Sequence, residues 1–372
     1  MPLLIPLAWD FRAEPHLAKR ENVMQAMSRR TLFAVMTGAV ALGAGPVTAQ
    51  EALTAAFYGG EWGDAIQSCI VDPFVKSSGT KVAPDPGVST VTLGKLRQQK
   101  GAPVIDVAWI DGGVSELASA DGLVADVSSQ AVPNIANMIP EGVYKTSAGA
   151  VYALSTGFYS MGLVYNTKEV KTPPASFWDL WKPEFANIST MPSPVNAMGV
   201  PLFMHLNKAL GGTTGNYEPA VKKYKELKVS SFFDTSGGAT NSFQSGEVVA
   251  GAHYASAAWS LADKGLPITY AAPKEGAPTN DIRVHIVKGT KNQAAAEKFV
   301  DFAVAKEQAA CMSEKLYVGP ATKGVMLSDK AKSRLPWGKD GSVANLALIN
   351  WTELNAQRQA ITDLWNKEIA RK

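Results

Sequence analysis

Two side chains of opposite charge lie two positions apart in the segment Asn280–Ile286, where apolar and polar residues alternate. The alternation predicts a β-strand whose apolar residues share one face, so Asp281 and Arg283 should lie side by side on the other face. An acid next to an arginine can hold an amine and a carboxylate together, as recognition of a small amino acid requires. The alternative is a solvated strand face with a surface ion pair that contributes little to stability.

The chain contains no arrangement of residues typical of a hydrolase. The motifs Gly-x-Ser-x-Gly and His-Glu-x-x-His do not occur in the sequence, and its four histidines are scattered. Its two cysteines have neither Cys-x-x-Cys nor metal-ligand spacing. We therefore expect a protein that is not an enzyme and that uses neither a metal nor a cofactor.

The N-terminal region reads as an export signal. The pair Arg29–Arg30 precedes an uncharged stretch over 34–44, and small residues follow up to Ala49. The apolar stretch is too short to span a membrane, so the pattern predicts a cleaved signal that directs the protein to the periplasm. The paired arginines favour the twin-arginine route, with the general secretory route and a retained anchor as alternatives. Met24 and Met27 are alternative translation starts.

The charge balance of the remaining chain argues against two classes of partner. Without the five basic and three acidic residues of positions 1–49, the chain has 31 basic and 30 acidic side chains. A near-neutral chain gives no indication of binding to nucleic acid or to an anionic membrane surface.

Strands and helices alternate along the first part of this chain. Apolar runs at 52–58, 80–83 and 104–109 predict strands, and helical spacing lies between them. This order is typical of an α/β protein with a mostly parallel sheet. Ligands bind such sheets at the carboxyl ends of the strands, so the loops Tyr58–Gly60 and Trp109–Gly113 should share one rim, with Asp111 in the second loop.

The rest of the chain adds further strands and a helix-rich end. We expect a Ser/Gly/Thr-rich loop over 235–242. The other predicted elements are strands at 152–154, 162–166, 248–253, 268–271 and 282–287, and helices after Ser176 and over 200–210, 217–227, 291–313 and 350–371.

Four motifs, in order and in register, resemble a known family. They are Tyr58-Gly59-Gly60, the run Ser176–Glu184, Ser245–Val248 and Pro273–Gly276. With these, the chain from about Leu53 to its end is similar to the extracellular solute-binding proteins of ABC importers, in the branch of the spermidine/putrescine receptors.

The resemblance implies a two-lobed type II periplasmic binding protein of the α/β class, with the ligand cleft between the lobes. It also implies an ABC permease and its ATPase as partners, a monomer, and no stable membrane insertion. The implied division is a leader at 1–49, a first lobe at 50–156 plus 285–349, a second lobe at 157–284 and a C-terminal helical segment at 350–372, with crossings near 155–157, 281–284 and 350.

The same assignment bears on the cysteines. Cys69 and Cys311 fall on helices of the first lobe, so we hypothesise a disulfide between them in an oxidising compartment. Two separate buried thiols are the alternative.

One departure from the family concerns the ligand. Polyamine receptors carry two carboxylates at the positions that are Ser193 and Asn196 here, and neutral groups cannot replace the solvation that a multivalent cation loses. A helix start with hydroxyl and amide groups suits an anion, although both residues can equally act as caps. The resemblance also implies an acidic ligand contact at or next to Asp281.

Aromatic residues complete the expected pocket, because flat rings exclude water and attract an ammonium group. Tyr254 matches a pocket aromatic of the family. The other candidates are Tyr58, Trp62, Trp109 and Phe158, with Trp259 as a further one.

These observations predict a receptor for a small polar solute, either an amino acid-like zwitterion or a carboxylate-bearing amine. A polyamine receptor is the first alternative. A secreted hydrolase and a protein that serves a sensor kinase are alternatives of other classes.

Overall fold

The computed structural model describes residues 52–346 and 348–370. The expected export signal and its cleavage near Ala49 lie outside the described residues. Within them, no helix has both the length and the apolar character needed to cross a membrane.

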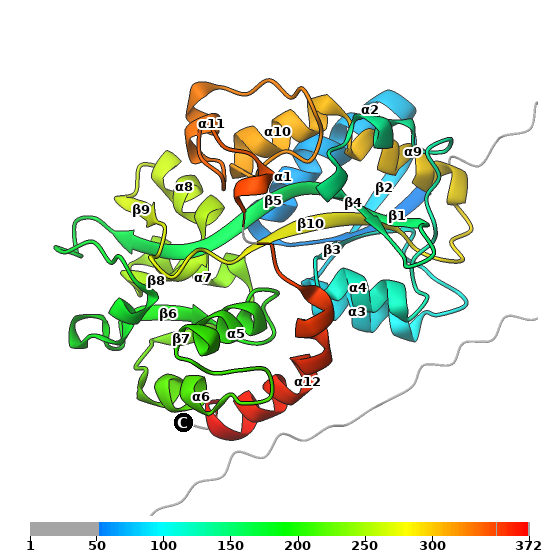
Figure 1. Cartoon of the computed structure of the whole chain (residues 1–372). Helices are drawn as coiled ribbons and strands as arrows, with labels where there is room; N and C mark the ends of the chain where they lie inside the picture. Colours follow the sequence, from blue (N-terminus) through cyan, green and yellow to red (C-terminus); the bar gives the residue numbers. More distant parts are fainter. Residues whose placement is uncertain (1–51, 347, 371–372) are drawn as a thin grey trace, which may run out of the picture. The chain divides into compact units, whose positions relative to one another are not determined.

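Strands pair in the order β2-β1-β3-β10-β5-β8-β6-β7, and β4 and β9 also pair with β5 (Figure 1). The strands are β1 (Ala52–Phe57), β2 (Lys81–Pro86), β3 (Val107–Asp111), β4 (Val143–Lys145), β5 (Val151–Asn166), β6 (Ser189–Pro192), β7 (Ser231–Phe233), β8 (Ala250–Tyr254), β9 (Ile268–Ala271) and β10 (Thr279–Ile286).

Parallel pairing is confined to the two outer parts of this arrangement. Strand β1 pairs in parallel with β2 and β3, and β6 pairs in parallel with β7 and β8. The central strands β5 and β10 are antiparallel to each other and to their other neighbours. The expectation of a mostly parallel sheet therefore holds within each outer part and is wrong for the strands that join them.

Strand β5 is continuous, although its sequence predicts two short strands with a gap between them. Its first part pairs with β4 and β10, and its last part pairs with β8 and β9. The gap is closed because residues 155–160 pair with β10, Met161 pairs with β8, and all of them are buried. Gly157 lies in this stretch, where a Cβ atom would come within 2.6 Å of a Val318 methyl carbon. The close packing there explains why the small residue is needed.

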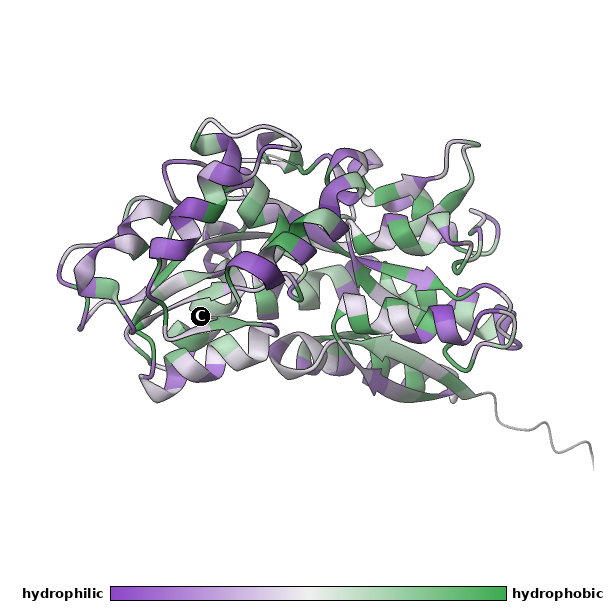
Figure 2. Ribbon diagram, turned by 90° about the horizontal axis from the view of Figure 1, so that it is seen from below, coloured by the Kyte–Doolittle hydropathy of each residue, from purple (hydrophilic) through white to green (hydrophobic). Residues whose placement is uncertain are grey.

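Helices cover both parts of the sheet. They are α1 (Gly60–Ile66), α2 (Asp72–Ser78), α3 (Ser89–Gln98), α4 (Val114–Ala120), α5 (Gly199–Ala209), α6 (Glu218–Glu226), α7 (Ser236–Ser245), α8 (Ala255–Asp263), α9 (Gln293–Ala303), α10 (Lys306–Leu316), α11 (Asp329–Arg334) and α12 (Trp351–Glu368), with a π-helical turn at Gln67–Val71. Below, the first lobe means β1–β4 with α1–α4, α9 and α10, and the second lobe means β6–β9 with α5–α8. Hydrophobic residues follow the central strands, while the outer helices carry hydrophilic ones (Figure 2).

Helix α7 occupies the segment that its Ser, Gly and Thr content predicts as a loop. The Thr235 hydroxyl accepts a hydrogen bond from the Gly238 amide at 3.1 Å and so caps the helix. Ala239, Thr240 and Phe243 are buried against the rest of the lobe. Capping and burial outweigh the low helix propensity of the glycines. Ser176 likewise caps a turn, which is a 3₁₀ helix (Phe177–Trp181).

Helix α12 contacts both lobes. Its Trp365 ring packs against Phe203, Tyr224 and Phe232 of the second lobe, with ring centroids 4.9–6.2 Å apart. At its other end, the Asn355 side-chain amide donates to the Gly113 carbonyl of the first lobe at 2.6 Å. The predicted helix over 350–371 is thus present over 351–368.

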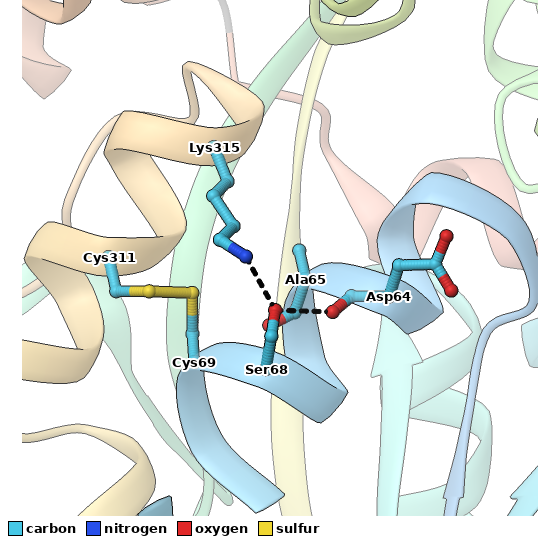
Figure 3. Close-up of a disulfide and its surroundings, with 6 residues drawn as sticks. All are labelled: Asp64, Ala65, Ser68, Cys69, Cys311 and Lys315. Atoms are coloured by element: carbon cyan, nitrogen blue, oxygen red, sulfur yellow. Dashed lines mark hydrogen bonds between the residues drawn. A yellow bond between two sulfur atoms is a disulfide. The ribbon is translucent and has the colours of Figure 1, made fainter. Parts of the chain in front are cut away.

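A disulfide joins Cys69, in the π-helical turn after α1, to Cys311 on α10 (Figure 3). Nearby, Lys315 on α10 donates to the Ser68 hydroxyl at 2.7 Å, and Ser68 donates to the Asp64 carbonyl at 2.6 Å. The two helical segments are therefore connected by a covalent bond and by a chain of hydrogen bonds.

Removal of the disulfide should destabilise the exported protein. The bridge spans 242 residues of sequence, and closing so long a loop in the unfolded chain contributes up to about 5 kcal/mol in the chain-entropy model. We expect the Cys69→Ala/Cys311→Ala double variant to unfold at lower urea concentration than the wild type. Thiol titration of the unreduced, denatured wild type should find no free sulfhydryl group, and two free thiols would contradict the bridge.

Candidate ligand-binding site

A small cavity of about 30 Å³ lies where the ends of β1 and β3 meet residues of the second lobe. A larger cavity of about 550 Å³ lies between α5 and the start of α12 and contains none of the expected ligand contacts. We take the small cavity as the candidate site because both loops expected to share one rim contribute to it. Its lining consists of Tyr58, Trp62, Val88, Ser89, Asp111, Tyr159, Asn196, Ala197, Ser236, Tyr254 and Ile282.

Four aromatic side chains, here called the aromatic cluster, form its walls: Tyr58, Trp62, Tyr159 and Tyr254. The Trp62 ring lies 5.4–6.2 Å from the other three ring centroids, and Tyr159 lies 5.2 Å from Tyr254. The interplanar angles are 67–75°. The four rings come from the end of β1, from α1, from β5 and from β8, so both lobes and the strand between them contribute to the walls.

Asp111 is the acidic residue of the cavity and ends strand β3. Its carboxylate accepts hydrogen bonds from the Ser89 hydroxyl and, at 2.6 Å, from the Tyr159 hydroxyl. The residue is 5 % exposed, and burial raises the pKa of its carboxyl group, against the effect of the hydroxyl donors. Within the described part of the chain, no Lys, Arg or His side chain forms an ion pair with it. Its charge is therefore not paired directly there, although the buried Arg358 guanidinium lies close enough to interact with it electrostatically.

Asn196 and Ser193 both lie in the turn before α5, but only Asn196 reaches the cavity. The Asn196 side-chain oxygen accepts from the Tyr254 hydroxyl at 2.7 Å and from the Met198 amide at 3.1 Å. Ser193 donates to Asp234 at 2.5 Å and accepts from the Val195 amide at 3.1 Å, so the structure shows it as a turn-capping residue outside the lining.

Asp281 and Arg283 do lie side by side, but away from the cavity. Arg283 is 1 % exposed and donates to both Asp281 oxygens at 2.9 and 3.1 Å, and to Glu116 at 2.6 Å. Its guanidinium carbon lies 3.3 Å from the centre of the Tyr144 ring. Ile282, on the opposite face of β10, lines the cavity instead. Asp281 and Arg283 thus form a buried internal ion pair outside the cavity lining, so the alternative of a surface pair is wrong, and their contact with a ligand stays a prediction.

Two further candidate aromatics belong to the core. Trp109 is fully buried, packs against Phe57 and Phe299, and donates to the Thr156 hydroxyl at 3.2 Å. Phe158 is also fully buried and faces Trp337. Trp259 lies outside the lining, beside Tyr270 and Arg334.

Several lining residues are not among the predicted contacts. For two of them, the sequence contains a pattern that places them at the cavity. Tyr159 follows Phe158, so the alternation of β5 points it to the other face, toward the cavity. Ser89 follows the carboxyl end of β2, where the rule used for Tyr58 and Asp111 also applies. The remaining ones, Val88, Ala197, Ser236 and Ile282, carry no chemical signal in the sequence.

Glu61, next to Trp62 on α1, has a buried carboxyl group close to the cavity. Both carboxyl oxygens are buried, and Ser260 of α8 is the side chain that interacts with them by hydrogen bonding. Burial raises the pKa of Glu61 to about 7, although Ser260 and Lys264 of α8 oppose the shift, and the nearby Asp64 adds to it. A carboxyl group of the first lobe therefore faces a helix of the second lobe and titrates near neutral pH.

A two-lobed α/β protein whose cavity lies at the junction of the lobes has the fold of the type II periplasmic binding proteins. Comparison with known proteins agrees. Residues 70–336 match the model of the bacterial extracellular solute-binding proteins, and the chain belongs to this family. It is thus a solute-binding protein that works outside the cytoplasm.

Individual relatives are more distant. The chain is 27 % identical over 287 residues to the spermidine/putrescine-binding periplasmic protein 1 of Haemophilus influenzae, covering 74 % of this chain and 76 % of the relative. Among solved structures, an ABC transporter from Clostridium perfringens matches with a TM-score of 0.64 and 23 % identity, over 85 % of this chain and 99 % of the other. The periplasmic binding protein AgtB from Agrobacterium tumefaciens R10, in complex with agropinic acid, matches with a TM-score of 0.72 and 20 % identity, over 87 % and 100 %.

Replacement of Arg283 should damage the fold rather than ligand binding. In Arg283→Met, the Asp281 carboxylate loses its ion-pair partner inside the protein, which costs about 3–5 kcal/mol of unfolding free energy. Lys95→Met, which breaks a half-exposed ion pair with Asp85, should cost less than about 1 kcal/mol. Urea unfolding measures both. If Arg283→Met is as stable as the wild type but no longer binds the ligand, Arg283 is a ligand contact and its structural role is wrong.

The Glu61 carboxyl group predicts a pH dependence of stability. Because the folded protein holds this proton more tightly than the unfolded chain, the contribution of Glu61 to stability is greatest below about pH 4.5 and falls as the pH rises to about 7. At pH 8 we expect Glu61→Gln to have a higher melting temperature than the wild type, corresponding to an unfolding free energy larger by roughly 1–3 kcal/mol. At pH 4.5 the two proteins should melt at nearly the same temperature. Glu141→Gln, at an exposed position, is the control. Equal melting curves of Glu61→Gln and wild type at pH 8 would contradict the assignment.

Proposed function

We propose that this protein is the receptor of an ABC importer and captures a small solute that carries an ammonium group and a polar or carboxylate end. The observation that carries this proposal is the Asp111 carboxylate, which is buried in the cavity and forms no direct ion pair among the described residues. In this proposal the lobes close around the solute and present it to the permease and its ATPase.

A cationic solute would compensate the cost of burying Asp111. An unpaired buried carboxylate loses the solvation that water supplies, and an ammonium group beside it restores a favourable electrostatic environment. The aromatic cluster around it excludes water and attracts cations to its ring faces. The Asp111 carboxylate and the aromatic cluster thus both favour an ammonium group.

The second lobe supplies neutral donors for the other end of the solute. Ser236 is the first residue of α7 and lines the cavity. The first amide groups of a helix have no partner within it, and only that of Gly238 is shown to bond to the capping Thr235 hydroxyl. A carboxylate or a hydroxyl group suits such a position. In this proposal the amide groups at the start of α7, rather than Arg283, contact the carboxylate of the solute.

A polyamine receptor is the second candidate, because one relative is named for spermidine and putrescine. A polyamine carries more than one ammonium group, whereas Asp111 is the one acidic residue in the cavity lining. Ser193 and Asn196 are neutral, and Glu61 lies outside the lining. The charge of the site therefore favours a solute with a single ammonium group. A receptor that serves a sensor kinase instead of a permease would have the same binding site.

Several finer statements belong to this proposal. We propose that the chain is exported by its N-terminal signal, is cleaved near Ala49 and acts as a monomer in the periplasm. The lobe boundaries proposed at 156/157 and 284/285 fall within β5 and β10, the two strands that run between the lobes. The small residues Ser155, Thr156 and Gly157 at the first crossing can absorb the rotation that closure requires.

Replacement of Asp111 tests the proposal. A thermal-shift screen with γ-aminobutyrate, glycine, glycine betaine, putrescine and spermidine should first find a stabilising amine. We expect Asp111→Asn to weaken binding of that amine by about 2–5 kcal/mol, measured by calorimetry, because the ammonium group loses its counter-charge. Asp121→Asn removes the same charge at the surface of the first lobe and should bind like the wild type. Unchanged binding by Asp111→Asn would contradict the proposal.

A further inference from the structure

The hydrogen-bonding capacity of Asp111 is partly occupied by the protein itself. One carboxylate oxygen accepts from the Ser89 hydroxyl, and the other accepts from the Tyr159 hydroxyl at 2.6 Å. The Asp111 amide in turn donates to the Ser89 oxygen at 3.0 Å, which fixes the hydroxyl in place. Asp111 thus offers its negative charge to a solute, but both of its oxygens already have a donor.

Other acceptors in the cavity are few. The Asn196 side-chain oxygen already accepts two hydrogen bonds, and Val88, Ala197 and Ile282 contribute apolar surface. The buried Tyr58 hydroxyl interacts with Asp111 and Ser89, so it is not a free acceptor for a solute. A primary ammonium group brings three N–H donors that need acceptors, and each donor left unpaired in such a cavity is costly.

The aromatic cluster has the geometry of a cage. Trp62 stands at 67–72° to Tyr58, Tyr159 and Tyr254, and Tyr159 stands at 75° to Tyr254. Rings inclined in this way are adjacent walls rather than a parallel stack. The cavity beside them measures about 30 Å³, so a cation fits among the rings only if Tyr254, on the second lobe, lies farther from the other three.

We propose that the cationic end of the solute is a fully methylated, quaternary ammonium group. Such a group has no N–H donors to satisfy, is held by charge from Asp111 and by the ring faces of the aromatic cluster, and leaves water more readily than a primary ammonium group does. This inference rests on the proposed function, since it names the class of solute for the same site.

Matched pairs of solutes test the inference. Choline with ethanolamine, and glycine betaine with glycine, differ only in methylation of the nitrogen, and calorimetry on the wild type compares them. We expect the methylated member of at least one pair to bind at least ten times more tightly than its unmethylated partner. The uncharged isostere 3,3-dimethylbutan-1-ol should bind at least ten times more weakly than choline, because it lacks the charge that Asp111 compensates.

Variants of the cage provide the second readout. Trp62→Leu should lose most of the affinity for the methylated solute, while Trp62→Phe keeps a ring and should retain more of it. Trp259→Leu changes an aromatic residue outside the lining and serves as the control. A Trp62→Phe protein that is folded and binds the methylated solute no better than Trp62→Leu would overturn the role of the ring.

The outcomes separate this inference from the proposed function. If unmethylated members bind equally well or better, or if only other amines such as γ-aminobutyrate or putrescine bind, the inference is wrong and the amine receptor stands. If no amine binds at all, both are wrong. A tenfold preference for methylation that disappears in Trp62→Leu supports both.

Discussion

The antiparallel pairing of β5 with β10 is the contact on which the rest of this protein depends. These strands join two outer sheets that are parallel within themselves, and they place residues of each lobe at one junction. Tyr159 on β5 and Ile282 on β10 reach the cavity from this pairing, and the strand faces opposite them hold the ion pair of Asp281 and Arg283. The strands β5 and β10 therefore both join the lobes and carry residues that line the cavity.

Buried charge is divided between two roles on either side of β10. Asp281 and Glu116 both pair with Arg283, and Arg358 interacts with Glu116 as well, which makes these residues a structural network of paired charges. Asp111 accepts hydrogen bonds from hydroxyl groups and forms no direct ion pair among the described residues. A buried ionisable group without a counter-charge, at the edge of a cavity, marks a functional site more strongly than a paired one does.

The sequence predicts the elements of this fold better than it predicts the direction of side chains. The rule that ligands bind at the carboxyl ends of strands correctly brings Tyr58 and Asp111 together. Alternation along β10 correctly separates two faces, but it does not say which face meets the cavity, and in the structure Ile282 rather than Arg283 lines it. Helix α7 was hidden because capping by Thr235 and burial of Phe243 are tertiary effects that its Ser and Gly content does not reveal.

The two attachments of α12 differ in kind. Aromatic packing of Trp365 holds its C-terminal half on the second lobe, whereas Trp351 lies over Gly112 and Gly113 of the first lobe and Asn355 adds one hydrogen bond there. In the proposed opening of the lobes, the first-lobe contacts of α12 are the ones that have to break, because its aromatic packing fixes it to the second lobe. The strength of these first-lobe contacts would then set how readily the protein opens.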